Sequence, residues 1–231
     1  MLANPQSVYF DLYSTLIFES ARNPFYDRVA TDLDIDKDVW LSHYGKRKYE
    51  SMAGDISGMD QRVYLSLKDS GYMRSERDVL RVVERHFSSF VESVSLYADT
   101  IMTLERLREL DLSLGLISNA SDHSVAIFES LGLRRFFDSV VFSFQHRCLK
   151  PDPRIYQVGL ADLRQTPSQA LYVGDGGDRE LSGARKLGFS TVLIDRGLPH
   201  TEAARLDADH VITDLAGILG IVDSLQSAVI K

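Results

Sequence analysis

Polar side chains follow several short apolar runs of the sequence, at the points where buried strands would end. They are Asp11, Ser118, Asn119, Lys150 and Asp175, with Asp178 and Glu180 shortly after the last. This set of carboxylates, hydroxyl, amide and ammonium suits attack by a carboxylate on an electrophile. A phosphate monoester is such an electrophile, but its negative charge would repel Asp11. A divalent cation relieves that repulsion, and a hard cation takes oxygen ligands such as Asp11 and Asp175.

The other members of the set have complementary uses. Lys150 would add positive charge beside the carboxylates, while the Ser118 hydroxyl and nearby backbone N–H groups would hold phosphoryl oxygens as negative charge spreads over them. Each residue alone has a simpler explanation. An aspartate after a strand is usually a turn or cap residue, and Ser118-Asn119 could be the N-cap of a helix. The order and placement of the whole set indicate a site.

Strand-like and helix-like patterns alternate along most of the chain. Strands are predicted at 8–10, 112–117, 139–142, 171–173, 191–194 and 211–212. Helices are predicted at 100–110, 124–131, 153–163, 180–187 and 215–226. This alternation indicates βαβ units, so we predict an α/β protein with a Rossmann-like parallel sheet core. Ligands of such sheets bind beyond the carboxyl ends of the strands, where the polar set would lie.

A long, mostly helical segment separates the first strand from the second. Asn23-Pro24 is typical of an N-cap followed by proline at the first helical position, and Ser75 and Asp78 have the spacing of a capping box. We predict a core domain of residues 1–17 and 95–231 and an inserted helical cap subdomain of residues 18–94. The basic segment 43–48 could reach an anionic substrate, although a solvated helix face is the preferred interpretation.

Composition excludes several classes of protein. The 26 Lys and Arg against 33 Asp and Glu give a formal net charge of -7, so no nucleic acid partner is expected. No apolar run is long enough to span a membrane. The single cysteine, Cys148, excludes an intrachain disulfide and fits a reducing compartment, and the N-terminal residues do not resemble a signal peptide. We therefore expect a cytoplasmic protein, of open oligomeric state, with a small phosphorylated substrate.

The polar segments resemble the four signature motifs of the haloacid dehalogenase-like (HAD) hydrolase superfamily. In order, they are VYFDLYSTL, LGLISNAS, CLKPDPRIY and LYVGDGGDRELSGARKLGF. The resemblance covers almost the whole chain, and the insert is similar to the helical cap that the phosphatase-type branch carries between its first two motifs. It implies a nucleophile (Asp11), a charge stabiliser (Lys150), phosphoryl-binding residues (Ser118 and Asn119) and a supporting residue in the first loop (Thr15). It also implies Mg²⁺ ligands in Asp11, Asp175 and the main-chain carbonyl of Tyr13.

Tyr13 departs from the phosphatase pattern. Phosphatases of the superfamily usually have, at this position, a second Asp that protonates the leaving group and later activates water. A phenol has an ordinary pKa of about 10, so Tyr13 can donate a proton but is a poor base near neutral pH. The haloacid dehalogenase branch has Asp-x-Tyr-Gly-Thr where this chain has Asp11-Leu-Tyr13-Ser14-Thr15, and it displaces halide without a leaving-group acid.

The fourth motif favours the phosphatase. Dehalogenases are neutral there, whereas this chain has Asp175, Asp178 and Glu180, which would repel one another without a cation. The spacing leaves open whether Asp178 or Glu180 is the second acid of the metal site, and we favour Asp178. The leading hypothesis is a Mg²⁺-dependent phosphatase that works through an aspartyl-phosphate. A metal-independent 2-haloacid dehalogenase, and a low-activity or non-catalytic binding protein, remain the alternatives.

Overall fold

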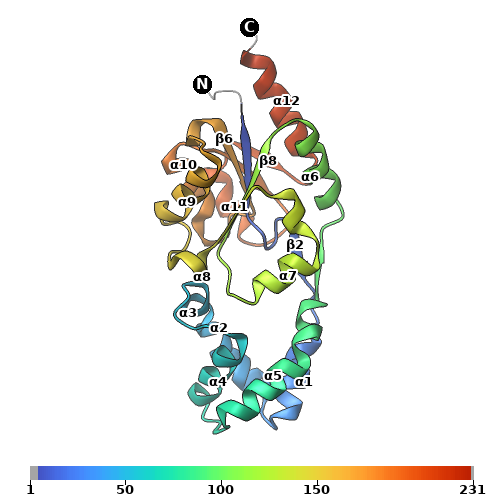
Figure 1. The fold of residues 1–231 in the computed structure, drawn as a ribbon, viewed down its shortest axis with the longest axis vertical. Coiled ribbons are helices and arrows are strands. Elements are labelled where there is room, and N and C mark those ends of the chain that lie inside the picture. The colour runs from blue at the N-terminus through green and yellow to red at the C-terminus, as the bar shows by residue number, and fades with distance from the viewer. Residues whose placement is uncertain (1–4, 230–231) are drawn as a thin grey trace.

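A parallel six-stranded sheet forms the centre of the larger, α/β part of the computed structural model, which describes residues 5–229 (Figure 1). The strand order is β5-β4-β1-β6-β7-β8. Their bounds are β1 (Ser7–Phe10), β4 (Ser113–Ser118), β5 (Ser139–Phe142), β6 (Ala170–Gly174), β7 (Ser190–Ile194) and β8 (His210–Ile212). The predicted α/β fold class is therefore confirmed. The outer ends of the predicted core, residues 1–4 and 230–231, lie outside the described residues.

Helices cover both faces of this sheet. They are α6 (Thr100–Glu109), α7 (Ser124–Ser130), α8 (Ser143–His146), α9 (Pro153–Leu163), α10 (Glu180–Leu187), α11 (Thr201–Ala204) and α12 (Gly217–Val229). Side chains alternate between faces along each strand, so Phe10 joins the apolar cluster under α6, α7 and α12, whereas Tyr9 joins the cluster under α9 and α10. Because both faces of the inner strands are buried, these strands read as continuous apolar runs, which is why the sequence reveals them.

Five helices form the cap at the end of the molecule opposite the two termini (Figure 1). They are α1 (Pro24–Asp32), α2 (Lys37–Lys46), α3 (Lys48–Met52), α4 (Met59–Asp69) and α5 (Glu76–Val91). Both helix starts expected from the sequence are confirmed. The Asn23 side chain accepts a hydrogen bond from the Phe25 amide at 3.0 Å, and the Ser75 hydroxyl accepts one from the Asp78 amide at 3.1 Å.

An antiparallel ribbon of β2 (Ile17–Glu19) and β3 (Val94–Leu96) joins cap and core. The sequence did not predict it, because each strand has three residues and only one of them is buried. The predicted limits of the cap, residues 18 and 94, fall within this ribbon. Beside it, the Ser20 amide donates to the Ser93 carbonyl at 2.8 Å, so the two ends of the insert are neighbours.

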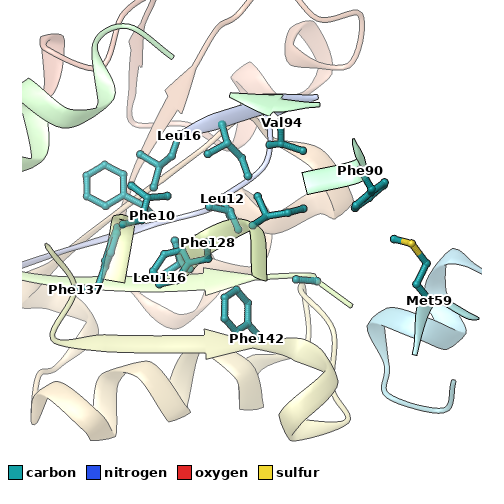
Figure 2. Packing of buried hydrophobic residues seen from close by; sticks show 14 of the residues in the cluster. Phe10, Leu12, Leu16, Met59, Phe90, Val94, Leu116, Phe128, Phe137 and Phe142 are labelled. Atoms are coloured by element: carbon teal, nitrogen blue, oxygen red, sulfur yellow. The ribbon is translucent and has the colours of Figure 1, made fainter. Parts of the chain in front are cut away.

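Buried side chains connect the sheet with the base of the cap. One apolar cluster (Figure 2) contains side chains from the sheet, the ribbon and the cap: Phe10 and Leu116 on the sheet, Leu16 just before β2, Val94 on β3 and Phe90 at the end of α5. The contact fixes the cap above the carboxyl ends of the strands. Among residues 5–229, no helix combines the length and apolar character that crossing a bilayer requires.

Candidate active site

The carboxyl ends of β1, β4 and β6 bring three of the predicted residues to one edge of the sheet. Asp11 directly follows β1, Ser118 is the last residue of β4, and Asp175 directly follows β6. These strands are neighbours and parallel, so their ends lie side by side. A cavity of about 1340 Å³ lies between this edge and the cap, and all three residues line it together with Lys150. The structure thus brings these four predicted residues together.

Lys150 is the centre of a buried charge cluster. Its ammonium is ion-paired with the carboxylates of Asp11 and Glu180, and all three side chains are more than nine-tenths buried. The Tyr172 hydroxyl lies 3.1 Å from the Lys150 nitrogen and donates to the Glu180 carboxylate at 2.9 Å. Tyr172 therefore holds the lysine and the glutamate in one arrangement.

Asp11, Asp175 and Glu180 form an acidic cluster with one oxygen of each within 4.8 Å of the others. Burial raises the pKa of Asp11 and of Glu180, and the charge of Lys150 opposes this rise. Burial alone would lower the pKa of Lys150, but the carboxylates of Asp11 and Glu180 outweigh it and the pKa is raised. The ammonium of Lys150 contacts two of these buried carboxylates and the third, Asp175, lies beside them, so this donor set fits a hard divalent cation.

Glu180, rather than the preferred Asp178, lies with Asp11 and Asp175. The backbone of Asp178 is left-handed, with φ of 50°, and its carboxylate accepts hydrogen bonds from Asn119 at 2.9 Å and Tyr49 at 3.0 Å. Glu180 begins α10, from which its side chain turns back over the end of β6. A Cβ atom added to Gly174 would lie 2.0 Å from the Glu180 Oε1 atom, so glycine is needed for this approach.

The predicted phosphoryl-binding residues differ in their surroundings. Ser118 lines the cavity, and its buried hydroxyl has no hydrogen-bond partner within residues 5–229. A buried hydroxyl without a partner is costly, so Ser118 is available for a ligand. Asn119 also lines the cavity, but its side chain accepts from the Lys150 amide at 2.7 Å and donates to Asp178, which positions the two loops. Thr15 is fully buried and does not line the cavity.

Tyr13 lines the cavity beside Asp11. Its hydroxyl lies 3.0 Å from the Ser124 hydroxyl at the start of α7. Burial raises the pKa of Tyr13 above its ordinary value, and the hydrogen bond with Ser124 opposes the rise. The phenol is therefore protonated at neutral pH and cannot act as a base there.

Two residues around the site were missed by sequence reasoning. His200, in the loop before α11, has its Nε2 atom 3.0 Å from an Asp175 carboxylate oxygen. Ser124 contacts Tyr13 although 111 positions separate them. Neither residue has a motif or spacing that could have revealed it, because both contacts depend on how the loops fold over the sheet edge.

Comparisons with known proteins agree with this architecture. The haloacid dehalogenase-like hydrolase family model matches residues 6–188. Over 131 residues the chain is 36% identical to the glyceraldehyde 3-phosphate phosphatase of Methanopyrus kandleri, a match that covers 55% of each chain, so this chain spans about half the length of that relative. Over 203 residues it is 29% identical to the (S)-2-haloacid dehalogenase 4A of Burkholderia cepacia, with 85% of each chain covered.

A solved structure shows the same fold. The HAD phosphatase of Thermococcus onnurineus superposes with a TM-score of 0.67 at 24% identity, and the match covers 94% of this chain and 97% of that one. At that identity the likeness shows the fold alone. The family match extends over most of the chain, from before β1 to the end of α10. The chain belongs to the haloacid dehalogenase-like hydrolase family.

Proposed function

We propose that this protein is a Mg²⁺-dependent phosphatase that hydrolyses a small phosphorylated metabolite. The observation that carries the proposal is the acidic cluster of Asp11, Asp175 and Glu180, of which Asp11 and Glu180 pair with the ammonium of Lys150. The excess negative charge at the edge of the cavity repels an anionic substrate unless a cation binds there. We propose as ligands these three carboxylates and the main-chain carbonyl of Tyr13, whereas Asp178 holds Asn119 and Tyr49.

In the first step, a carboxylate oxygen of Asp11 attacks the phosphorus atom. The new bond joins Asp11 to phosphorus, the ester P–O bond breaks, and the leaving oxygen departs with its electron pair and takes a proton from solvent water, which gives the alcohol. Lys150 fixes the orientation of the Asp11 carboxylate. The Ser118 hydroxyl donates a hydrogen bond to a phosphoryl oxygen. Mg²⁺, when bound, supplies positive charge that offsets the charge on the phosphoryl oxygens.

In the second step, water attacks the phosphorus atom of the aspartyl-phosphate. The Asp11–phosphorus bond breaks, inorganic phosphate leaves, and the Asp11 carboxylate is restored. Because the phenol of Tyr13 stays protonated, it cannot take the proton of that water at neutral pH. The structure therefore predicts that this step limits turnover.

The relatives support the proposal at the level of reaction class. One is a phosphatase of a small sugar phosphate, and another is a haloacid dehalogenase. Both reactions begin with attack by a carboxylate, so the resemblance alone does not separate them. The charge of the site supports the phosphatase, because an uncharged carbon–halogen bond needs no cation beside Asp11 whereas an anionic phosphate does.

Phosphate release from a panel of phosphomonoesters tests the proposal. With Mg²⁺ we expect release from at least one ester, with loss of activity in EDTA and in the Asp11→Asn variant. The control is Asp38→Asn, because Asp38 is exposed on α2 and does not line the cavity. Activity that persists in EDTA, or in Asp11→Asn, would contradict the proposal.

A 2-haloacid dehalogenase is the second candidate, and Tyr13 is the observation that favours it. Halide release from 2-chloropropionate in the presence of EDTA would support this reaction. If neither assay shows turnover while Mg²⁺ and a phosphate mimic still bind, the chain is a binding protein of the same family. We expect no halide release, because the buried carboxylates would repel a haloacid carboxylate in the absence of a metal.

A further inference from the structure

Arg62 on α4 lies in the cap wall of the cavity, and its side chain carries an unusual buried charge. The residue is only 8% exposed, yet it lines the cavity that contains Asp11. Its Nε and Nη2 atoms donate to the Tyr44 carbonyl at 3.2 and 2.9 Å, and the guanidinium lies 3.8 Å from the centre of the Tyr44 ring. These contacts fix the guanidinium in one orientation.

In the described part of the chain, no carboxylate lies within ion-pair distance of this guanidinium. Among the described residues, Arg62 forms no ion pair with an Asp or Glu, whereas Arg47 and Arg85 of the same cap pair with Asp69 and Asp32. Glu19 also lines the cavity, but its carboxylate accepts a hydrogen bond from Asn23 at 2.8 Å and makes no ion pair with Arg62. A buried charge without a counterion is costly, so its presence in a cavity wall points to an anion that binds there.

The surroundings of Arg62 connect it with the reacting centre. Burial raises the pKa of Tyr26, and the nearby Arg62 guanidinium opposes this while the neighbouring Tyr13 adds to it. Tyr13 lies two residues after Asp11. Tyr26 and Tyr44, whose rings lie 5.9 Å apart, line the same cavity as Asp11 and Arg62.

We infer that Arg62 determines substrate specificity by binding a second anionic group, a carboxylate or a further phosphate, of a substrate whose phosphoryl group lies at Asp11. The inference rests on the proposed function for the position of the phosphoryl group. The chemistry is that of a guanidinium, which offers its N–H donors in a plane that matches carboxylate and phosphate oxygens. The neutral polar walls around it would orient the rest of the molecule.

Binding of non-hydrolysable phosphonates tests this by calorimetry in the presence of Mg²⁺. The probes are ω-phosphonocarboxylates of three to six carbons, α,ω-alkanediphosphonates of the same lengths, and alkylphosphonates of matched length that lack the second anion. A charge-assisted hydrogen bond to a buried guanidinium predicts that the best doubly anionic probe binds about 10- to 100-fold more tightly than its matched alkylphosphonate. The carboxylate and diphosphonate series show which anion the site prefers.

Variants assign the preference to Arg62. Arg62→Met should reduce the preference to less than about threefold, and Arg62→Lys should keep only part of it, because an ammonium lacks the planar fork. The control Arg28→Met makes the same change of charge on α1, at an exposed residue outside the cavity, and should keep the preference. The readout is the ratio of two affinities in one protein, so a general loss of stability cancels. If Arg62→Met does not fold, the ratio of the two affinities in Arg62→Lys tests the inference instead.

A wild-type protein without preference at any chain length would overturn the inference, as would a preference unchanged in the Arg62 variants. Phosphonates are not hydrolysed, so this outcome is independent of turnover. Phosphatase activity with no preference for a second anion would support the proposed function but contradict the role of Arg62. If the preference depends on Arg62 but the protein releases phosphate from no ester, the result would support the anion site and contradict the proposed function.

Discussion

Lys150 balances the charge of the site because its ammonium contacts two carboxylates that would otherwise repel each other. The side chains of Lys150, Asp11 and Glu180 are almost inaccessible to solvent, so their interaction is poorly screened. Asp175 adds a third carboxylate within reach of the same point. The lysine alone cannot neutralise the group, which is the physical basis for expecting a bound cation.

Tyr13 is the residue whose replacement should increase activity. Its protonated phenol cannot serve as a base, whereas an aspartate at this position could protonate the leaving group and then activate water. A positioned acid–base group contributes roughly 10²–10⁴-fold to a rate, so we expect Tyr13→Asp to raise the kcat of phosphate release by at least about tenfold. Steady-state kinetics with Mg²⁺ would measure the change.

Tyr13→Phe is the matched control for that substitution. It removes the hydroxyl that contacts Ser124 but keeps the ring, and we expect it to change kcat by less than about threefold, because a phenol with a raised pKa contributes little to proton transfer. A fall in kcat for Tyr13→Asp would show that the tyrosine has a catalytic or packing role that aspartate cannot fill.

The identity of the third carboxylate shows the limit of sequence reasoning at this scale. Counting positions from Asp175 does not separate Asp178 from Glu180. The backbone does, because Asp178 and Arg179 both adopt positive φ angles before α10 begins, and this turn sends the two acids in different directions. Left-handed conformations at non-glycine residues have little signature in a sequence, so the arrangement could not be predicted.

At the scale of elements, the strands and helices that the sequence predicted are those whose burial leaves an apolar pattern in the sequence. The six strands of the sheet and the helices between them follow from continuous apolar runs and helical periodicity, and the polar residues at the strand ends follow from the parallel topology. The β2–β3 ribbon and the approach of His200 to Asp175 could not be predicted, since they depend on tertiary contacts of short segments.

The start of α5 gives a prediction about the stability of the cap. The Ser75 hydroxyl accepts the Asp78 amide hydrogen bond, and loss of an N-cap side chain typically costs about 1 kcal/mol. We expect Ser75→Ala to lower the free energy of unfolding by about that amount, measured by urea denaturation. Ser88→Ala, at an exposed position inside the same helix, should be neutral or slightly stabilising, because alanine favours helix interiors. Equal effects of the two substitutions would contradict the role of Ser75 as a cap.

For the molecule as a whole, the buried acids couple stability to pH and to metal. Burial raises the pKa values of Asp11 and Glu180 in the folded protein, so the unfolded chain releases these protons first. In the absence of metal, their contribution to stability is fully present below the ordinary carboxyl pKa of about 4 and is lost as pH rises through the raised values. A cation at the cluster would reverse this loss.

Mg²⁺ should therefore stabilise the protein more at higher pH. Binding requires the carboxylates to be ionised, so it displaces protons, and the Mg²⁺ dissociation constant should fall by up to about tenfold per pH unit for each proton displaced. The increase in Tm that Mg²⁺ produces over EDTA should be larger at pH 8 than at pH 5.5, as differential scanning calorimetry can measure. A Tm increase that does not vary with pH would mean that Asp11 and Glu180 are already ionised in the metal-free protein.

The hydrogen bond between Ser20 and Ser93 holds the two ends of the cap insertion together, so the chain leaves the core and returns to it at one place. Strand β1 pairs with β4 and β6 outside this insertion, so their register does not depend on its length. Lengthening, shortening or exchanging the segment between those two serines would alter the cap side of the cavity while the strand ends stay in register. If the proposed function holds, contacts to the rest of the substrate and the reacting residues would thus be encoded in separable stretches of sequence, so that either could diversify while the other is preserved.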